Sequence, residues 1–212
     1  MQVGILGSGP VAQVLAAGFL GHGHSVMLGT RDPSKLAGWT SEHPGARVGS
    51  FAGTAAWAEL VVLAVKGAVA ADVLRAAGAA NLAGKPVIDT TNPIADAPPD
   101  QGVLRFFTTL DDSLMERLQR EMPEARLVKA FNSVGNRRMV DPSFKGGKPS
   151  MFICGDDAEA KQVVRGVLDQ FGWETEDMGG AASARAIEPL CILWCIPGFL
   201  RNEWEHAFKV LR

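Results

Sequence analysis

Tyrosine is absent from this chain of 212 residues, cysteine is sparse, and neither sign of charge dominates. The three cysteines, Cys154, Cys191 and Cys195, are typical of reduced thiols in a cytoplasmic protein and do not form a disulfide framework. A net charge of −2, from 21 basic and 23 acidic residues, offers no concentrated basic surface. Nucleic acid and anionic membranes are therefore not expected as partners, and a small-molecule substrate is.

Long hydrophobic runs are missing as well. Met1 leads directly into a predicted strand, with no basic segment and cleavable apolar stretch of an export signal. The longest apolar run near the C-terminus, residues 189–200, has 12 residues and contains two prolines. Such a run is too short to span a bilayer, so we expect a cytoplasmic protein.

Short apolar runs alternate with amphipathic stretches of helical length, a pattern typical of a parallel sheet covered on both faces. Strands are predicted at residues 2–6, 25–29, 46–49, 60–65, 86–90, 127–131, 151–154 and 174–178, and helices at 10–21, 33–39, 54–58, 69–80, 113–121 and 158–171. A last helical segment begins near residue 181 and is broken by Pro197. We predict a doubly wound Rossmann α/β domain over residues 1–180 and a small C-terminal helical segment over 181–212.

The pattern G-x-G-x-x-A directly follows the first predicted strand, at residues 7–12. In this position Gly7 permits a tight turn, Gly9 lets the backbone approach a pyrophosphate, and Ala12 lets the helix pack close to the strand. Pro10 fits the first helical turn, where its missing N–H costs nothing. The helix would offer free N–H groups to phosphates, whereas the alternative is a purely structural turn.

The end of the second predicted strand decides which dinucleotide fits. An NAD site has an acidic residue there, whereas this strand ends in Thr30 and Arg31, and a guanidinium suits a 2′-phosphate. Asp32 precedes Pro33 as a helix N-cap would, so we assign it to capping. Ser34 and Lys35 would add to the phosphate pocket. NADP(H) is therefore predicted; the alternative is that the basic residues are solvated surface charges.

Polar residues follow three further predicted strands, at Val65-Lys66-Gly67, Asn92-Pro93 and Asn132-Ser133-Val134. Ligands of open parallel sheets lie beyond the carboxyl ends of the strands, so these clusters are expected to frame the nicotinamide. Asn132 and Ser133 could bond its carboxamide or a substrate carbonyl. The alternative for each residue is a capping role in a turn.

Acid-base machinery is scarce at these strand ends. Lys66 is the only ionisable side chain that we expect there, and the lack of tyrosine excludes a Tyr-Lys proton relay. His206, with Glu203 and Glu205, has no established ligand spacing, so no metal is predicted. A site that only orients two stacked rings suits hydride exchange between nicotinamide and a second redox ring, with no catalytic side chain.

Six motifs in order along the chain resemble the family of coenzyme F420-dependent NADP reductases, whose nucleotide domain is also similar to that of mammalian membrane metalloreductases. They are GILGSGPVA (4–12), GTRDPSK (29–35), AVKG (64–67), VIDTTNPI (87–94), VKAFNSVG (128–135) and GGAASARAIEPL (179–190). The resemblance implies a Rossmann domain, often a homodimer, in which a deazaflavin stacks on the nicotinamide. Lys66 departs from the family, where an apolar residue or proline is common.

Carried onto this chain, the resemblance implies that NADP contacts Gly7, Ser8, Gly9, Pro10, Val11, Thr30, Arg31, Lys35, Val65 and Ala130, while Asn92, Asn132 and Val134 face the second ring. Ser34, Ala64, Lys66, Asn92 and Asn132 complete the predicted cofactor site. The second substrate would be coenzyme F420 or a flavin.

Two other functions are compatible with the sequence. One is NADPH-dependent reduction of a small imine or hydroxy acid, although such enzymes usually carry a longer helical domain than the roughly 30 residues that follow Gly180. The other is a non-catalytic NADPH sensor, in which side chains would fill the space beside the nicotinamide.

Overall fold

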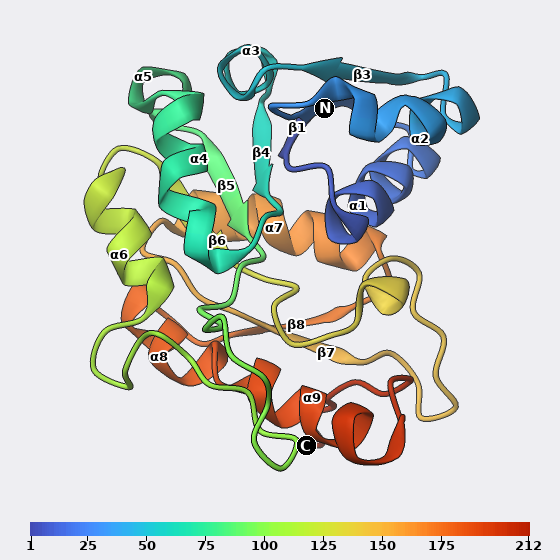
Figure 1. Cartoon of the computed structure of the whole chain (residues 1–212), viewed down its shortest axis with the longest axis vertical. Coiled ribbons are helices and arrows are strands. Elements are labelled where there is room, and N and C mark those ends of the chain that lie inside the picture. The colour runs from blue at the N-terminus through green and yellow to red at the C-terminus, as the bar shows by residue number, and fades with distance from the viewer.

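A computed structural model describes residues 1–212 and contains a six-stranded parallel sheet flanked by helices (Figure 1). Its strands are β1 (Gln2–Leu6), β2 (Ser25–Gly29), β3 (Ala46–Gly49), β4 (Leu60–Leu63), β5 (Pro86–Asp89) and β6 (Arg126–Lys129). They lie in the order β3-β2-β1-β4-β5-β6, so the direction of winding reverses between β1 and β4. This order confirms the predicted doubly wound Rossmann fold.

Two more strands, β7 (Ser150–Ile153) and β8 (Glu174–Asp177), form a separate parallel pair below the main sheet in Figure 1. The helices are α1 (Pro10–Gly21), α2 (Ala37–Glu42), α3 (Phe51–Trp57), α4 (Ala70–Ala77), α5 (Ala79–Leu82), α6 (Leu114–Glu121), α7 (Ala158–Gln170), α8 (Ala184–Ile187) and α9 (Leu190–Arg201). Short 3-10 turns are η1 (Pro33–Leu36), η2 (Gly67–Val69), η3 (Asn136–Arg138) and η4 (Ala181–Ser183).

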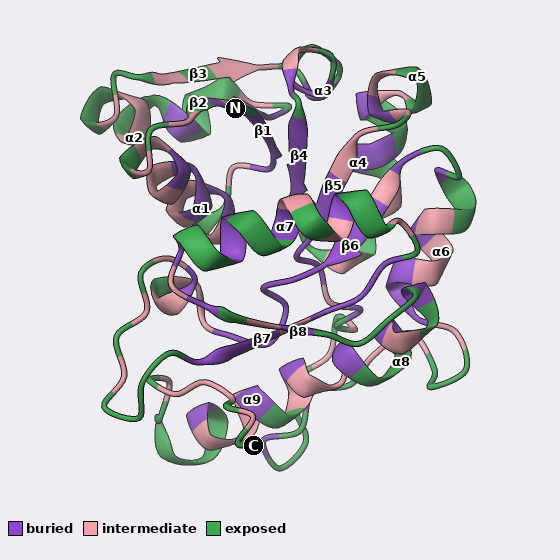
Figure 2. Cartoon of the chain, turned by 180° about the vertical axis from the view of Figure 1, so that it is seen from behind, coloured by how far each residue is buried: buried purple, intermediate pink, exposed green.

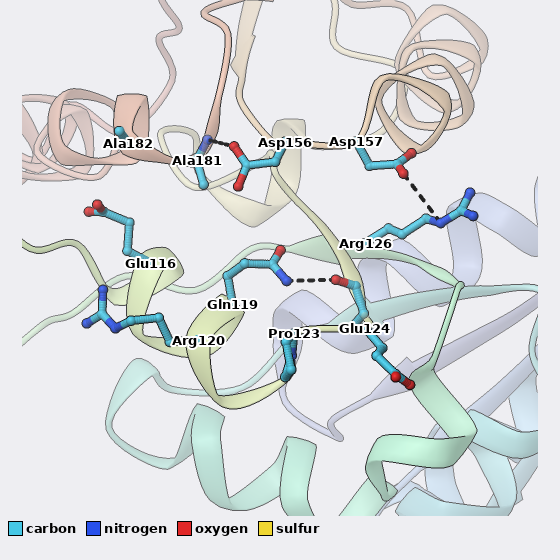
Figure 3. A pocket seen from close by; sticks show the side chains of 11 residues that line it. Glu116, Gln119, Arg120, Pro123, Glu124, Arg126, Asp156, Asp157, Ala181 and Ala182 are labelled. Carbon is cyan, nitrogen blue, oxygen red and sulfur yellow. Dashed lines mark hydrogen bonds and ion pairs between the residues drawn. The ribbon is translucent and has the colours of Figure 1, made fainter.

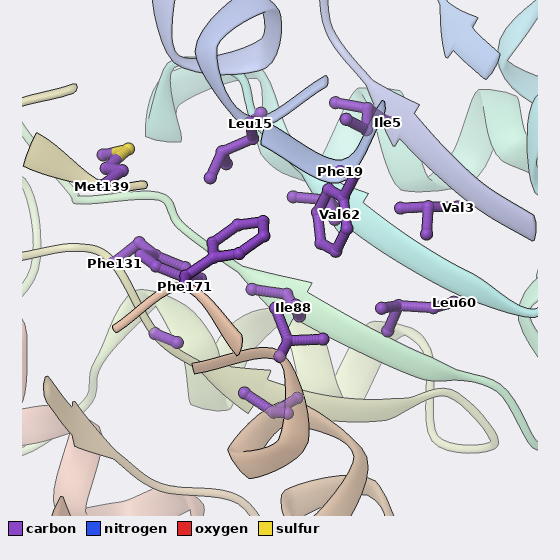
Figure 4. Packing of buried hydrophobic residues seen from close by; sticks show 14 of the residues in the cluster. Val3, Ile5, Leu15, Phe19, Leu60, Val62, Ile88, Phe131, Met139 and Phe171 are labelled. Atoms are coloured by element: carbon purple, nitrogen blue, oxygen red, sulfur yellow. The ribbon is translucent and has the colours of Figure 1, made fainter. Parts of the chain in front are cut away.

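The main sheet separates two hydrophobic cores. In β4, Leu60 and Val62 belong to the core that α1 and α7 cover, and Val61 and Leu63 belong to the core under α3, α4 and α6. This partition follows from the period of two in a strand, and it explains why the strand is apolar throughout. Figure 2 shows α7 on one face of this sheet, with its buried side toward the sheet and its other side exposed. Figure 4 shows the core that α1 and α7 cover, where Phe19 and Phe171 pack with their ring centroids 4.9 Å apart.

Three predicted helices differ from those observed. The predicted helix 33–39 is the 3-10 turn η1 followed by α2. Gly78 has φ +89, which separates α4 from α5 within the predicted helix 69–80, because only glycine adopts this conformation without strain. Pro197 does not break the last helix: α9 continues through it to Arg201. Proline has no N–H to donate to the carbonyl of Leu193 four positions earlier, and Leu193 lies on the exposed side of α9, with 55% of its surface accessible. The helix ends instead at Asn202, in the left-handed conformation (φ 56).

The C-terminal segment is helical only as far as Arg201. Residues 202–212 carry no helix and lie against β7, where Ser150 donates its amide to the carbonyl of Phe208 (2.9 Å). Trp194 of α9 donates its indole N–H to the carbonyl of His206 (2.9 Å), which fastens this tail to the helix. The predicted segment 181–212 is therefore part helix and part extended chain.

The helical stretch Ala181–Arg201 passes the length and hydropathy criteria for a membrane span, and 33% of its apolar window is buried in the protein. The core helix of a soluble protein passes the same test, so this stretch is weak evidence for a membrane segment. Its first half contacts α6 and the core beneath α4.

Candidate functional site

The carboxyl ends of five neighbouring strands, β2, β1, β4, β5 and β6, form one row, the strand-end row. Register pairs Leu6 of β1 with Gly29 of β2 and with Leu63 of β4, and the row continues from Leu63 to Asp89 and from Asp89 to Lys129. Every predicted site residue follows one of these positions within six residues along the chain. The fold therefore brings the predicted residues to one edge of the sheet, at the point where the winding reverses.

The glycine-rich turn has the geometry of a phosphate-binding loop. Gly7 has φ +147, and a Cβ there would lie 2.2 Å from the carbonyl oxygen of Ala64. Gly9 caps α1 with φ −80, and a Cβ there would meet no atom within 4 Å. The amides of Ser8, Gly9 and Val11 donate no hydrogen bond within the chain, so they are free for an anion at the N-terminus of α1.

The turn after β2 carries free basic groups. Arg31 and Lys35 are exposed and make no ion pair, while Thr30 is buried and its hydroxyl accepts the Asp32 amide (3.1 Å). Asp32 caps η1, as predicted, by accepting the Ser34 amide (3.1 Å) and hydroxyl (2.5 Å). The Ser34 hydroxyl lowers the pKa of Asp32 below its usual value. Ser34 is thus engaged with Asp32, whereas the cations remain available.

The segment after β4 approaches the one after β5. Ala64 is buried, Val65 is half-buried, and Lys66 is exposed at the start of η2 without an ion pair. A Cβ on Gly67 would lie 2.1 Å from the carbonyl oxygen of Asn92. The two backbones therefore come together only because position 67 is glycine.

Asn92 and Asn132 form a reciprocal pair across the ends of β5 and β6. The Asn92 amide donates to the Asn132 carbonyl (2.7 Å), and the Asn132 amide donates to Oδ1 of Asn92 (3.2 Å) and to the carbonyl of Ile187 (2.9 Å). Oδ1 of Asn132 is buried and accepts no hydrogen bond within the chain. Phe131, just before it, has φ +62, a strained conformation for a buried aromatic residue, and such strain is often found at functional sites.

Two predicted residues near this pair lie in the core. Ala130 is completely buried and Val134 is 7% exposed, and both belong to the core that α1 and α7 cover. Ala130 contacts the strand-end row through its backbone, where its N–H donates a hydrogen bond to the carbonyl of Asp89 (3.1 Å). The contact of Ala130 with NADP and that of Val134 with the second ring stay predictions.

A buried ion triad of Asp89, Lys129 and Glu188 lies next to the asparagine pair, and the sequence analysis did not predict it. Nζ of Lys129 lies 2.7 Å from Oδ2 of Asp89 and 3.0 Å from Oε1 of Glu188, and all three side chains are at most 3% exposed. Burial by itself lowers the pKa of Lys129, but the two carboxylates outweigh it and hold that pKa above its ordinary value. Lys66 is therefore not the only ionisable side chain at these strand ends, which corrects the prediction.

Could the sequence have revealed the triad? Asp89 and Lys129 are the charged residues within the largely apolar predicted strands 86–90 and 127–131, and they end the observed strands β5 and β6. Glu188 lies far away in sequence, in the motif GGAASARAIEPL, and this motif does not show which residues Glu188 meets. Cys154 lies next to the triad, and burial raises the pKa of its thiol to about 12, so it is unreactive.

A cavity of about 700 Å³ lies elsewhere, near the amino end of β6 (Figure 3). Its lining is mixed in charge: Glu116, Gln119, Arg120, Pro123, Glu124, Ala125, Arg126, Asp156, Asp157, Ala181 and Ala182. Arg126 begins β6 and Lys129 ends it, so this cavity and the strand-end row lie at different ends of that strand. No group of three or more His, Cys, Asp and Glu side chains is placed to hold a metal ion.

Taken together, the strand order, the glycine turn and the free amides of α1 define a Rossmann domain of the dinucleotide-binding class. A family model described as NADP oxidoreductase, coenzyme F420-dependent, matches residues 2–93. A crystal structure from Arthrobacter sp. FB24, provisionally described as an F420-dependent NADP reductase, is 37% identical, has a TM-score of 0.92 and is matched over 99% of both chains. The chain therefore belongs to this family of NADP oxidoreductases, which confirms the resemblance.

Two curated relatives are longer than this chain. Metalloreductase STEAP3 of Rattus norvegicus is 33% identical over 204 residues, which cover 94% of this chain and 39% of the relative. The F420-dependent NADP reductase of Methanocaldococcus jannaschii is 31% identical over 110 residues, 51% of this chain and 48% of the relative. An imine reductase of Streptomyces aurantiacus shares only the fold, with 19% identity and a TM-score of 0.69 over 94% of this chain and 63% of that chain.

Proposed function

We propose that this chain transfers a hydride between NADP(H) and a deazaflavin of the coenzyme F420 type or a flavin. The observation that carries the proposal is the strand-end row, which joins unpaired phosphate-binding groups at β1 and β2 to a fixed amide pair at β5 and β6. Lys66 is the one exposed ionisable side chain directly after β4, β5 and β6. Ring-to-ring hydride transfer needs orientation more than proton transfer by the protein, so it suits this site.

Each part of the row has a role in this proposal. The free amides of Ser8, Gly9 and Val11 would hold the pyrophosphate, and Arg31 with Lys35 and Thr30 would hold the 2′-phosphate. Oδ1 of Asn132 would accept the carboxamide N–H of the nicotinamide. When bound, NADPH would supply the hydride, and solvent would supply the proton that completes reduction of the acceptor.

The direct test follows NADPH absorbance while purified protein is mixed in turn with coenzyme F420, FMN and riboflavin. Oxidation of NADPH that depends on both the protein and one of these acceptors would support the proposal. A protein that binds NADPH tightly and yet turns over none of the three would refute the hydride-transfer assignment. The Arg31→Ala variant serves as control, because its rate should fall when NADPH is limiting.

We also propose a cytoplasmic homodimer with a small redox molecule as its only other partner. In support, all three cysteines are free thiols, and Leu193, Phe199 and Leu200 expose 55, 43 and 55% of their surface on α9. A Leu200→Glu variant should shift the mass measured by light scattering from dimer to monomer. A wild-type mass that already corresponds to a monomer would rule the dimer out.

A further inference from the structure

We propose that the buried triad of Asp89, Lys129 and Glu188 positions the Asn92–Asn132 pair against the nicotinamide end of bound NADPH. This inference rests on the proposed function, and it assigns a role to three residues that lie within the family motifs and have no predicted ligand contact. The triad joins the end of β5, the end of β6 and the junction between α8 and α9, which are far apart in sequence and which these ion pairs bring together in the fold.

Lys129 meets only protein oxygens. Nζ donates a hydrogen bond to the carbonyl of Thr91 (2.8 Å) and lies at ion-pair distance from Oδ2 of Asp89 (2.7 Å) and Oε1 of Glu188 (3.0 Å). The side chain is completely buried. It therefore has no path to substrate, and it acts through other residues.

The two carboxylates are equally committed. Oδ1 of Asp89 accepts the amide (2.9 Å) and hydroxyl (2.7 Å) of Thr91. The two oxygens of Glu188 accept the amides of Leu114 (3.0 Å) and Met115 (2.9 Å) in the first turn of α6. One lysine and two carboxylates leave a formal charge of −1, which the N-terminus of α6 offsets. The triad is thus a stable arrangement of ionised groups.

Each end of the triad adjoins one end of the asparagine pair. Lys129 binds the carbonyl of Thr91, the residue before Asn92. Asn132 lies three residues after Lys129, and its amide binds the carbonyl of Ile187, the residue before Glu188. The backbones on both sides of the pair are therefore fixed by one charged cluster, which restricts the position of Oδ1 of Asn132.

Stability alone does not account for such a cluster. Desolvation of buried ions offsets most of their attraction, and apolar residues of similar size are often as good for the fold. A function that depends on a fixed geometry does account for it, since a buried network of charges and hydrogen bonds specifies one arrangement of its members.

The test compares two ligands that share the adenosine and its phosphates, NADPH and 2′,5′-ADP, by calorimetry. Only NADPH reaches the asparagine pair. In the Glu188→Gln variant, which keeps the size of the side chain and leaves a neutral cluster, NADPH affinity should fall about fivefold or more, while 2′,5′-ADP affinity stays within about twofold. Arg185→Ala is the matched control: it removes a neighbouring link from α8 to α6, the ion pair to Glu116 (2.6 Å), and should alter neither affinity.

Several results would overturn the positioning role. One is a folded Glu188→Gln protein with wild-type affinity for both ligands; another is an equal loss for both, which indicates general loosening. If Glu188→Gln does not fold, the neutral triple variant Asp89→Asn, Lys129→Met, Glu188→Gln is measured in the same way. If that variant also fails to fold, the triad acts on the fold as a whole and the assignment is wrong. Wild-type protein that binds neither ligand refutes the proposed function itself, a result distinct from the others.

Discussion

The two halves of the strand-end row use polar groups in opposite ways. Around β1 and β2, the amides of the glycine turn and the cations of Arg31 and Lys35 have no partner within the chain. Around β5 and β6, nearly every polar group is paired: Lys129 has three partners, Glu188 has three, and Asn92 pairs with Asn132.

This difference separates affinity from orientation. Exposed charges and free amides can gain energy from a phosphate, because their partners in the unbound state are water. The buried charges of the triad have no exposed group to offer a ligand, but they hold the neighbouring asparagine pair in one geometry. Substitutions in the two halves should therefore have different signatures, and the following predictions test that contrast.

The largest effect is expected for Lys129→Met. Removal of the ammonium leaves two carboxylates buried side by side, which should lower the free energy of unfolding by about 3–5 kcal/mol. Urea denaturation measures this loss. The matched control is Lys161→Met, which removes a partly exposed pair with Asp177 (3.0 Å) and should cost less than about 1 kcal/mol. Equal losses for the two variants would show that burial of the triad carries no special cost.

In the β1 half, Gly7→Ala and Gly9→Ala form a matched pair. Gly7→Ala places a methyl group against the carbonyl of Ala64 at φ +147, and should destabilise the fold by about 2 kcal/mol or more. Gly9→Ala has space and an allowed φ, so stability should change by less than about 0.5 kcal/mol while NADPH affinity falls. Thermal melts and calorimetry separate the two effects. An unchanged NADPH affinity in Gly9→Ala would argue against a pyrophosphate at this turn.

Arg31→Ala should affect binding and leave the fold intact. Loss of a charge-assisted contact to the 2′-phosphate should weaken NADPH binding by about 1.5–3 kcal/mol. NADH lacks that phosphate, so its affinity should hardly change. Titration of both nucleotides gives the comparison, and an equal loss for both would contradict the role of Arg31.

The smallest expected effect is on the stability of the protein in acid. Arg185, and then the amide and hydroxyl of Ser113, lower the pKa of Glu116 from its usual 4.5 to about 2. Because the folded pKa is the lower one, the stabilisation is present above pH 4.5 and is lost as pH falls toward 2.

Glu116→Gln, which preserves the helix cap, should therefore cost less than about 1 kcal/mol at pH 7 and nothing near pH 2. Urea midpoints measured between pH 2 and 7 give this difference. A gap between variant and wild type that persists at the acid end would contradict the lowered pKa.

Local sequence signals predicted most of the β1 and β2 half. The glycine turn, the Asp32 cap and the basic residues after β2 lie within about 30 residues of one another, and each depends on backbone conformation that neighbours determine. The Rossmann fold was also predicted from the sequence, because alternating strands and helices are compatible with few other strand orders.

Local signals failed where distant segments meet. Pro197 was expected to end a helix, but its surroundings let α9 continue, and Asn202 ends it instead. The strand-end charges Asp89 and Lys129 could have been noticed, but their partner Glu188 is 59 positions beyond Lys129. No propensity or spacing rule links residues so far apart.

The glycine turn, the Asp32 cap and the strand-to-helix junctions around β1 and β2 follow from contiguous residues, so the chain's local order was enough to predict them. The meeting of β5, β6 and the α8–α9 junction in one buried charge cluster depends on folding of the whole chain. A lysine and two carboxylates lose their hydration on burial, so they can be buried only where the fold brings all three together.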